Sequence, residues 1–496
     1  MACLDLGQSP VVLLGVRRVH LGAASSPVAK LQRHAAGAPR RDRVEDAGAR
    51  GGSAEISAWS AGRSSRELQR CRTDPQRMRN FTYFSASPVR STAFSRRPAS
   101  LYAAESVLLL LPGREGARMN RIDTLLDAAE TRSADIVAAT ISAIGFESVA
   151  DLLFQEILFR ARIDEVAGHG HAATTLILVH AGHKAEFTVQ AEPRGGDLPA
   201  VVITQDAAET ILALYGPRES VSADTRTVCW PGTELAQRAW AKKPLPGRWA
   251  GSPQRILDVL DRRDQENLGR LAVYYGTDKW GAAHRYTPRY EQHLGPLRDR
   301  RLTILEIGVG GYDDPQSGGE SLRMWKHYFP RAVVCGLDIV DKRALAEPRI
   351  SIFQADQSDR DSLLAVIDEI GRPDVIIDDG SHVSAHIIAS FQALFPSLRQ
   401  DGLYFIEDLQ AALWAPVFGG SEDDLTRPDH AFGFLKQFID GLHHEEFLGD
   451  SRTAVPTDQE VTALHVYHNL AVIEKGRNAD GSPSADLMRA FMPRNG

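Results

Sequence analysis

The feature that most constrains the fold of this 496-residue chain is a regular alternation of apolar runs and amphipathic stretches between residues 302 and 406. Short apolar runs predict buried strands, and the longer periodic stretches between them predict helices. Repeated strand–helix units pair their strands in parallel and place helices on both faces of the sheet. The sequence therefore predicts an α/β fold with a doubly wound parallel sheet. The predicted strands are 302–307, 333–337, 350–353, 375–377 and 403–406, and the predicted helices are 321–329, 361–370 and 384–398.

Two apolar segments near the end of the chain break this alternation. Val461 to Tyr467 and Leu470 to Glu474 are separated only by His468 and Asn469. Two residues are enough for a tight turn but leave no room for a crossover helix. We expect an antiparallel hairpin at the edge of the sheet.

The remaining chain divides into further segments, because its length exceeds what one hydrophobic core usually supports. Residues 1–118 are rich in Arg, Ala, Ser and Gly without periodicity, which predicts a disordered leader or a start site placed too early, with Met119 as the natural first residue. Residues 119–240 have the pattern of a small α+β auxiliary domain with an antiparallel sheet. Residues 241–253 are a Pro/Gly-rich linker, and 254–496 form the main domain.

Composition argues against several classes of protein. Four scattered cysteines without a CxxC pair argue against a disulfide framework or a structural zinc site. The longest apolar run near the start, 107–112, is far shorter than the ~20 residues that a membrane helix requires. The net charge is −7, and the basic residues of the leader are scattered without interleaved aromatic residues. We therefore expect a cytoplasmic protein that binds neither membrane nor nucleic acid.

A glycine-rich turn follows the first strand of the predicted sheet. Gly308, Gly310 and Gly311 allow the backbone to approach a ligand closely, because no Cβ atom obstructs it. A dinucleotide site would require G-x-G-x-x-G leading into a helix, with an acidic residue about 20 positions later. Here a loop follows the glycines, and the acidic residue at the end of the second strand, Asp338, lies 30 positions after Gly308.

These departures favour S-adenosylmethionine over a dinucleotide as the ligand of the turn. Glu306 lies at the start of the turn, where a carboxylate would attract the cationic sulfonium and ammonium groups. Asp338 would accept hydrogen bonds from the ribose hydroxyls. Asp356 and Gln357, just after the third strand, would meet the adenine edge.

Acidic residues also close the last two predicted parallel strands. Asp378 and Asp379 follow the strand 375–377, and Glu407 and Asp408 follow 403–406. The carboxyl ends of parallel strands meet at one edge of the sheet, where such folds bind ligands. Carboxylate oxygens without cysteine ligands suit Mg²⁺. The sequence therefore predicts a magnesium site formed by Asp379, Glu407 and Asp408.

A histidine follows the first of these acidic pairs. Histidine is the side chain whose unperturbed pKa lies near neutral pH, so we expect His382 to act as the general base that removes a proton from an acceptor hydroxyl. His386 lies four positions later and could form an i, i+4 metal-binding pair with His382. We favour a packing role for His386, because three carboxylates already provide a set of ligands.

Seven segments resemble the macrocin and mycinamicin sugar O-methyltransferases of macrolide antibiotic biosynthesis. The resemblance is dense from about residue 274 to 476, and it is carried by 275–279 (YGTDK), 284–290 (HRYTPRY), 305–312 (LEIGVGGY), 321–325 (SLRMW), 378–382 (DDGSH), 406–408 (IED) and 465–469 (HVYHN).

The family resemblance implies roles for particular residues. It implies Mg²⁺ on Asp379, Glu407 and Asp408, with His382 as the general base. It implies that the chain binds S-adenosylmethionine through a larger set, to which we add the nearby Tyr274: Tyr274, Leu305, Glu306, Ile307, Gly308, Val309, Gly310, Gly311, Ser321, Asp338, Asp356 and Gln357. It also implies a helical and antiparallel auxiliary domain, and a homotetramer in which a neighbouring subunit completes each active site.

We therefore expect an S-adenosylmethionine- and Mg²⁺-dependent O-methyltransferase that acts on a sugar hydroxyl of a glycosylated natural product such as a macrolide. A polysaccharide sugar, a glycolipid sugar or a catechol is the alternative acceptor. A non-catalytic protein that binds S-adenosylmethionine is a second alternative, and a dehydrogenase ranks last because the glycine spacing differs. We expect residues 409–447 to cover the acceptor.

Overall fold

The computed structural model describes residues 15–18, 121–166, 172–190, 200–243, 249–281, 283–449 and 453–491. The chain divides into two compact units, Met1–Gly22 with Phe94–Gly496, and Ala23–Ala93, and every described residue lies in the first. Of the predicted leader, the structure describes only the strand β1 (Gly15–Arg18). The rest of that prediction, including the start at Met119, lies outside the described residues.

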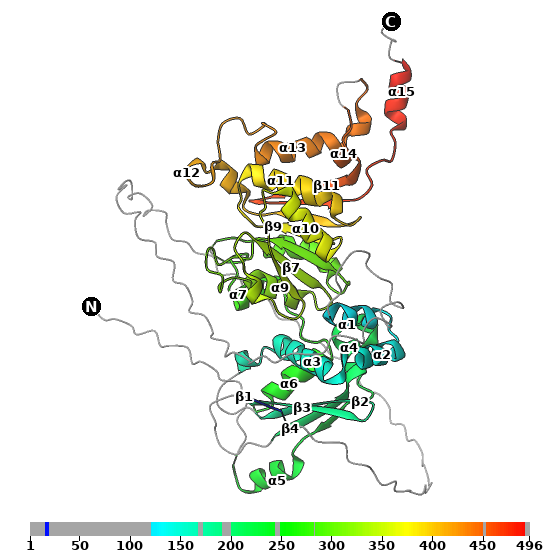
Figure 1. The fold of residues 1–496 in the computed structure, drawn as a ribbon, viewed down its shortest axis with the longest axis vertical. Helices are drawn as coiled ribbons and strands as arrows, with labels where there is room; N and C mark the ends of the chain where they lie inside the picture. The colour runs from blue at the N-terminus through cyan, green and yellow to red at the C-terminus, as the bar shows by residue number, and fades with distance from the viewer. Residues whose placement is uncertain are drawn as a thin grey trace, which may run out of the picture. The chain divides into compact units, whose positions relative to one another are not determined.

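Residues 121–260, drawn from cyan to green in Figure 1, form helices and four strands, which β1 extends to a five-stranded sheet. The helices are α1 (Arg121–Glu130), α2 (Ala134–Ile144), α3 (Phe146–Ala161), α4 (Ala207–Tyr215), α5 (Gly232–Trp240) and α6 (Gly251–Leu260). The strands are β2 (Thr174–His180), β3 (His183–Gln190), β4 (Val201–Asp206) and β5 (Thr227–Cys229), in the order β1-β3-β2-β4-β5. This part is the expected α+β auxiliary region.

The prediction of an antiparallel sheet in this region is wrong for one pair of strands. β2 pairs with β3 in antiparallel register, but it pairs with β4 in parallel register from Thr174–Val201 to Val179–Asp206. Alternating burial along a strand reports which face meets the core, and it carries no information on the direction of the neighbouring strand. The mixed sheet arises because β4 returns on the side of β2 opposite to β3.

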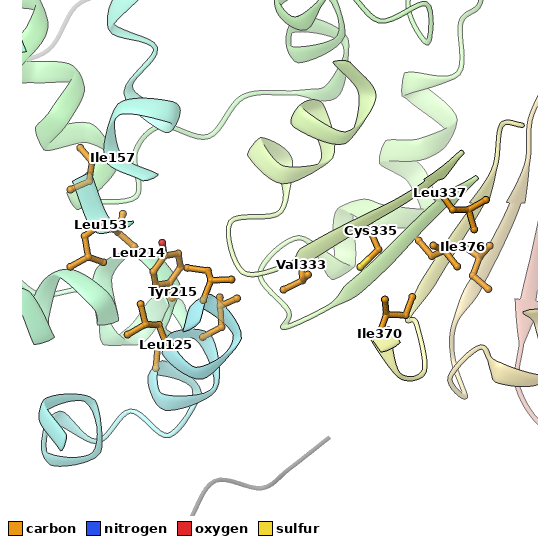
Figure 2. Packing of buried hydrophobic residues seen from close by; sticks show 14 of the residues in the cluster. Leu125, Leu153, Ile157, Leu214, Tyr215, Val333, Cys335, Leu337, Ile370 and Ile376 are labelled. Atoms are coloured by element: carbon orange, nitrogen blue, oxygen red, sulfur yellow. The ribbon is translucent and has the colours of Figure 1, made fainter. Parts of the chain in front are cut away.

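The helices of this region pack through fully buried aliphatic side chains. Leu125 of α1, Leu153 of α3 and Leu214 of α4 are inaccessible to solvent, and Figure 2 shows them in one group. α6 packs against α3 and α4. α6 spans the predicted boundary at residue 253, and that boundary stays a prediction.

Residues 268–491 contain the doubly wound sheet, whose seven strands have the order β11-β12-β10-β9-β6-β7-β8. The strands are β6 (Thr303–Ile307), β7 (Val333–Asp338), β8 (Ile350–Gln354), β9 (Val375–Asp378), β10 (Leu403–Ile406), β11 (Val461–Tyr467) and β12 (Leu470–Lys475). The helices are α7 (Leu268–Tyr275), α8 (Thr287–Leu294), α9 (Glu320–Tyr328), α10 (Arg360–Ile370), α11 (Ser384–Leu394), α12 (Ala415–Phe418), α13 (Ala431–Leu442), α14 (Pro456–Glu460) and α15 (Pro483–Phe491). The predicted fold class is confirmed.

The order of the strands determines where a ligand can bind. β6, β7 and β8 extend the sheet in one direction, while β9 and β10 extend it in the other. All these pairs are parallel, and folds of this kind bind ligands outside the carboxyl ends of the strands where the strand order reverses, which are here β6 and β9. β11 and β12 form the predicted hairpin at the edge, and β12 pairs with β10 in antiparallel register.

Within the described ranges, none of the individual helices is both long and apolar enough to cross a membrane. Only the pair α2 and α3, bent by 109°, has a sufficient combined length and composition. Cys229 and Cys335 are both free thiols.

Candidate active site

Three strand ends form the base of the site. The backbone N–H of Asp379 donates to the carbonyl of Ile307 at 3.0 Å, and the N–H of Glu407 donates to the carbonyl of Asp378 at 2.9 Å. These bonds continue the parallel ladders β6–β9 and β9–β10 by one residue beyond the strands. The side chains that follow β9 and β10 are therefore placed side by side, as the sequence predicts for parallel strands.

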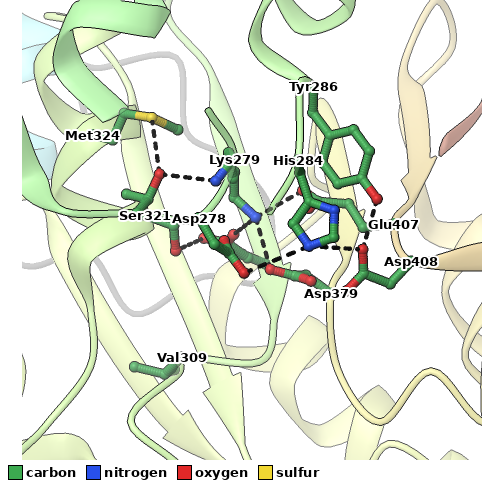
Figure 3. Close-up of polar contacts among 12 residues, drawn as sticks. Asp278, Lys279, His284, Tyr286, Val309, Ser321, Met324, Asp379, Glu407 and Asp408 are labelled. Carbon is green, nitrogen blue, oxygen red and sulfur yellow. Dashed lines mark hydrogen bonds and ion pairs between the residues drawn. The ribbon is translucent and has the colours of Figure 1, made fainter. Parts of the chain in front are cut away.

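The structure brings three of the predicted residues into one group. Asp379, His382 and Asp408 each offer a ligand atom within 4.8 Å of the other two, and His382 Nε2 lies 3.8 Å from Asp408 Oδ2. Glu407 is buried beside them, but its Oε1 atom accepts hydrogen bonds from Lys279 and Tyr290. Figure 3 shows Asp379, Glu407 and Asp408 around one small region.

Lys279 is a residue of the site that the sequence interpretation missed. Its side chain is fully buried, and Nζ lies 2.7 Å from Asp379 Oδ2, 2.7 Å from Glu407 Oε1 and 3.3 Å from Glu306 Oε1 (Figure 3). Burial alone would lower the pKa of Lys279, but the three carboxylates outweigh burial and hold that pKa well above its usual value. The ammonium group of Lys279 therefore contacts both Glu306, just before the glycine turn, and the carboxylates that follow β9 and β10.

For two carboxylates of this cluster, in contrast to Lys279, burial outweighs the charge of the neighbouring groups. Burial, reinforced by Asp379, raises the pKa of Glu407 well above its ordinary value, and the nearby Lys279 opposes that rise. Burial likewise raises the pKa of Asp379, again opposed by Lys279. Without further positive charge, the cluster therefore favours binding a proton or a cation.

α8 and the residues before it hold the acidic pair from the other side. Tyr286 donates to Asp408 Oδ1 at 2.6 Å, and Tyr290 donates to Glu407. His284 stacks on Tyr286 with a centroid distance of 4.7 Å, and its Nε2 lies 3.4 Å from Asp408 Oδ1. The 284–290 segment carries the family resemblance, but sequence alone did not show that its aromatic side chains contact these two carboxylates.

The backbone is strained at two of the proposed functional residues. His382 has a φ of 57° and Asp408 a φ of 53°, the left-handed region that non-glycine residues rarely adopt. Such a conformation costs about 1–3 kcal/mol and persists where the surrounding contacts enforce it. Both residues belong to the group with Asp379.

The glycine turn is required by close backbone contacts. Gly308 has a φ of 91°, and a Cβ atom at this position would overlap the carbonyl oxygen of Asp379. Gly311 has a φ of 75°, and its Cβ would overlap the carbonyl of Ser317. Gly310 also has a positive φ of 79° but faces open space within 4 Å. Two of the three glycines are therefore needed for packing as well as for conformation.

Glu306 and Ser321 of the predicted donor set lie together. Ser321 Oγ donates to Glu306 Oε2 at 2.9 Å, and Trp325 Nε1 donates to the same oxygen at 3.2 Å. Burial raises the pKa of Glu306 to about 7, and Lys279 opposes that rise. Leu305 and Ile307, also of the predicted set, are buried in the same strand β6.

The acidic residue after β7 and the amide after β8 have different local roles. Asp338 accepts the N–H of Val309 at 3.0 Å, so the second strand holds the glycine turn. Gln357 uses both ends of its amide within the protein, donating to Asp378 Oδ1 at 2.7 Å and accepting the N–H of Ser381 at 2.9 Å. It therefore joins the loops after β8 and β9.

The two other members of the predicted set lie at the margins of this arrangement. Asp356 is partly exposed, and hydrogen bonds from the side chain and N–H of Ser358 lower its pKa. Tyr274 lies below the Arg162 guanidinium at 4.9 Å and packs edge-on against Tyr275. Donor-binding roles for both stay predictions.

Residues 409–447 border the acidic group. The Phe418 ring in α12 meets His382 at 6.0 Å with an interplanar angle of 69°, and it also contacts Trp414. Trp414 is half exposed. His386 Nδ1 forms a hydrogen bond with Ser381 Oγ at 2.9 Å, which supports the packing role over metal binding.

The ligand atoms of this group suit Mg²⁺. Asp379 and Asp408, two of the three predicted ligands, offer carboxylate oxygens close enough to share one ion, and Mg²⁺ retains further positions for water or substrate oxygens. Bound there, the ion would lower the pKa of a ligated hydroxyl.

Comparison with known proteins identifies both regions of the chain. Residues 122–226 match the family model described as MycE methyltransferase N-terminal. An 8-demethyl-8-α-L-rhamnosyl tetracenomycin-C 2'-O-methyltransferase of Streptomyces olivaceus is 43% identical over 370 residues, which cover 72% of this chain and 95% of the relative. The mycinamicin VI 2''-O-methyltransferase of Micromonospora griseorubida is 45% identical over 226 residues, covering 45% of this chain and 56% of the relative.

Solved structures give a similar result. The MycE methyltransferase of the mycinamycin pathway, solved with Mg, S-adenosylhomocysteine and mycinamycin VI, superposes with a TM-score of 0.63 at 31% identity. The match covers 76% of this chain and 98% of that structure.

Proposed function

The chain belongs to the MycE-like family of sugar O-methyltransferases, and we propose that it methylates a sugar hydroxyl of a glycosylated polyketide with S-adenosylmethionine as the donor. The observation that carries this proposal is the group of Asp379, His382 and Asp408 at the carboxyl ends of β9 and β10, beside the glycine turn after β6. In this proposal, a base and cation ligands lie next to a donor loop.

The donor is proposed to lie against the glycine turn. The closely packed backbone at Gly308 and Gly311 leaves room for a ligand over Gly310, whose Cβ direction is open. Asp338 lies at the end of the next strand, where its remaining lone pairs can accept from a ribose. Glu306, whose Oε1 lies 3.3 Å from Lys279 Nζ, is proposed to face the cationic part of the donor.

The acceptor is proposed to lie between this donor and His382. Asp379, Glu407 and Asp408 hold Mg²⁺ in this proposal. His382 takes the proton of the reacting hydroxyl, and the oxygen forms a bond to the methyl carbon as the carbon–sulfur bond breaks, which leaves S-adenosylhomocysteine. Asp408 Oδ2 lies 3.8 Å from His382 Nε2, beside the proposed base.

Replacement of His382 by Ala tests the base. Loss of a general base costs about 10²–10⁴-fold in rate. We expect His382→Ala to lose that much S-adenosylhomocysteine formation while still binding S-adenosylhomocysteine in calorimetry. His386→Ala is the matched control, because this histidine lies four positions later in the chain and contacts Ser381. A His382→Ala enzyme within a few-fold of the wild-type rate contradicts the assigned role.

The acceptor class needs a separate assay. We propose a panel that contains a rhamnosylated tetracenomycin, mycinamicin VI, a catechol and a polysaccharide, each with S-adenosylmethionine and Mg²⁺. Turnover confined to the glycosylated polyketides supports the proposal, whereas turnover of the catechol or the polysaccharide alone refutes this acceptor class. Binding of the donor without methylation of any acceptor would favour the non-catalytic alternative.

Two further properties extend the proposal. We propose a homotetramer on the family resemblance, to be tested by light scattering coupled to size exclusion. We propose a cytoplasmic location because the cysteines are few and scattered, and Cys229 and Cys335 are free. Cell fractionation tests the location, and recovery from an oxidising compartment would refute it.

A further inference from the structure

A second group of metal-binding side chains lies outside the acidic site. His293 of α8, His465 of β11 and Glu474 of β12 each offer a ligand atom within 4.8 Å of the other two. Their histidine rings lie 4.6 Å apart by centroid and are tilted by 63°. We propose that these three side chains form a binding site for a transition-metal ion such as Zn²⁺, distinct from the proposed magnesium site.

The register of the hairpin brings two of the ligands together. Ala463 pairs with Glu474 and His465 pairs with Val472, so His465 and Glu474 are diagonal neighbours on one face of the hairpin. His465 Nε2 lies 2.7 Å from Glu474 Oε1. The two side chains converge before any ion binds.

His293 completes the group from the helix that packs on this face. Its Nδ1 lies 3.9 Å from Glu474 Oε1, while its Nε2 forms a hydrogen bond with the Tyr467 hydroxyl at 2.9 Å. Metal-binding histidines typically use one ring nitrogen for the ion and fix the other through such an outer hydrogen bond. The Tyr467 ring is itself held by the Arg289 guanidinium, 4.8 Å above it. The imidazole is therefore oriented for binding through Nδ1.

The type of ligand selects the ion. Two imidazole nitrogens and one carboxylate suit Zn²⁺ or a similar borderline ion, whereas Mg²⁺ prefers oxygen ligands. The His293 side chain is 6% exposed, but those of His465 and Glu474 are 34% and 38% exposed, so water can occupy a fourth position. His293 also lies in the last turn of α8, where the helix dipole favours a cation.

The location of this group connects it to the acidic site. Tyr290 and His293 are three positions apart on α8, so they share a face of that helix. Tyr290 donates to Glu407, and His293 faces the hairpin. An ion held between α8 and the hairpin would therefore fix the helix that positions a proposed magnesium ligand.

Zinc titration of the full-length, metal-stripped protein in excess Mg²⁺ tests this inference, because Mg²⁺ competes for the oxygen-rich site. We expect wild-type protein to bind one Zn²⁺ per chain by calorimetry. Cobalt as a probe should give the visible absorption of a low-coordinate nitrogen and oxygen site. His465→Ala and the more conservative Glu474→Gln should each abolish this binding, with folding checked by circular dichroism.

Two controls separate the site from adventitious binding. His468→Ala removes an exposed histidine from the turn of the same hairpin and should leave Zn²⁺ binding unchanged. His382→Ala should also leave it unchanged, because that residue belongs to the acidic group. Tyr467→Phe keeps all three ligands and should weaken Zn²⁺ binding by about 10–100-fold, the usual effect of losing an outer hydrogen bond.

The results can also overturn the inference. Absence of Zn²⁺ binding in excess Mg²⁺ refutes the site. Binding that survives His465→Ala and Glu474→Gln, or that disappears in His382→Ala, assigns the ion to another place and equally refutes it. Neither result bears on methyl transfer, so this test stands apart from that of the proposed function.

Discussion

Replacement of Lys279 by Met tests whether one buried charge holds the acidic site together. The ammonium group is fully buried within 2.7 Å of oxygens of both Asp379 and Glu407 and within 3.3 Å of Glu306. Methionine is similar in length but uncharged, so the substitution leaves three carboxylates without their shared partner. Breaking a buried ion pair by removing one partner costs about 3–5 kcal/mol, a large share of an ordinary free energy of unfolding.

Urea unfolding in the presence of a chelator measures this cost. We expect Lys279→Met to lose about 3–5 kcal/mol in the free energy of unfolding at pH 7. Added Mg²⁺ should stabilise the variant more than the wild type, because Asp379 no longer shares its charge with the ammonium group. The loss should also shrink at acidic pH, where the orphaned carboxyl groups take up protons and no longer need a cation.

A second buried lysine provides the control. Lys342 is also fully buried, but its Nζ donates to the backbone carbonyls of Asp314 and Ser317 at 2.9 and 3.0 Å. Lys342→Met should lose about 1–3 kcal/mol from unsatisfied carbonyls and should show no added response to Mg²⁺. A loss below about 1 kcal/mol for Lys279→Met, or equal Mg²⁺ responses in both variants, would refute the reasoning.

Three further predictions concern the surrounding structure. Gly308→Ala should lose about 2–4 kcal/mol in the free energy of unfolding by urea, because its Cβ would overlap a backbone carbonyl. Gly310→Ala should lose only the cost of the left-handed backbone conformation, about 1–2 kcal/mol. Equal losses would contradict the packing argument. Burial raises the pKa of Asp378 to about 6, so its contribution to stability is greatest below the unfolded pKa of about 4 and is lost as pH rises through 6. Asp378→Asn should therefore flatten that part of the profile of unfolding free energy against pH, measured in chelator. An unchanged profile would refute this role of Asp378. Burial opposes the ionisation of Glu156, but Arg349 and other cations outweigh it and hold the Glu156 pKa well below its usual value. Glu156→Gln should therefore lose about 3–5 kcal/mol in the free energy of unfolding at pH 7, and this loss should become smaller as pH drops below about 4. A loss that does not change with pH would exclude the ionic cause.

The local pattern of apolar residues was enough to predict most of residues 268–491, which contain the doubly wound sheet. The apolar runs ending at Ile307, Ile377 and Ile406 are strands buried on both faces, and parallel pairing puts the residues after them at one edge. Asp379, His382 and Asp408 could therefore be grouped from sequence, because each lies within a few positions of a strand end. The same logic failed for the sheet of the auxiliary region, since periodicity does not report strand direction.

Residues that reach the site from outside the parallel strands could not be predicted in this way. Lys279 contacts carboxylates 100 and 128 positions later in the chain, and nothing in its local sequence indicates burial. Tyr290 similarly contacts Glu407 because α8 packs across the end of the sheet. The contacts of the Gln357 amide with Asp378 and Ser381 could not be predicted either, and the donor-binding role of Gln357 stays a prediction.

The sequence by itself determined the sheet, the glycine turn and the edge where the acidic residues gather, because strand ends and turns depend on periodicity and on backbone sterics near each residue. Only the tertiary structure decided which charges meet. Burial of Lys279 among carboxylates and convergence of His293 with the hairpin both depend on how helices pack over the sheet. Such contacts depend on packing between distant segments, which no local pattern encodes.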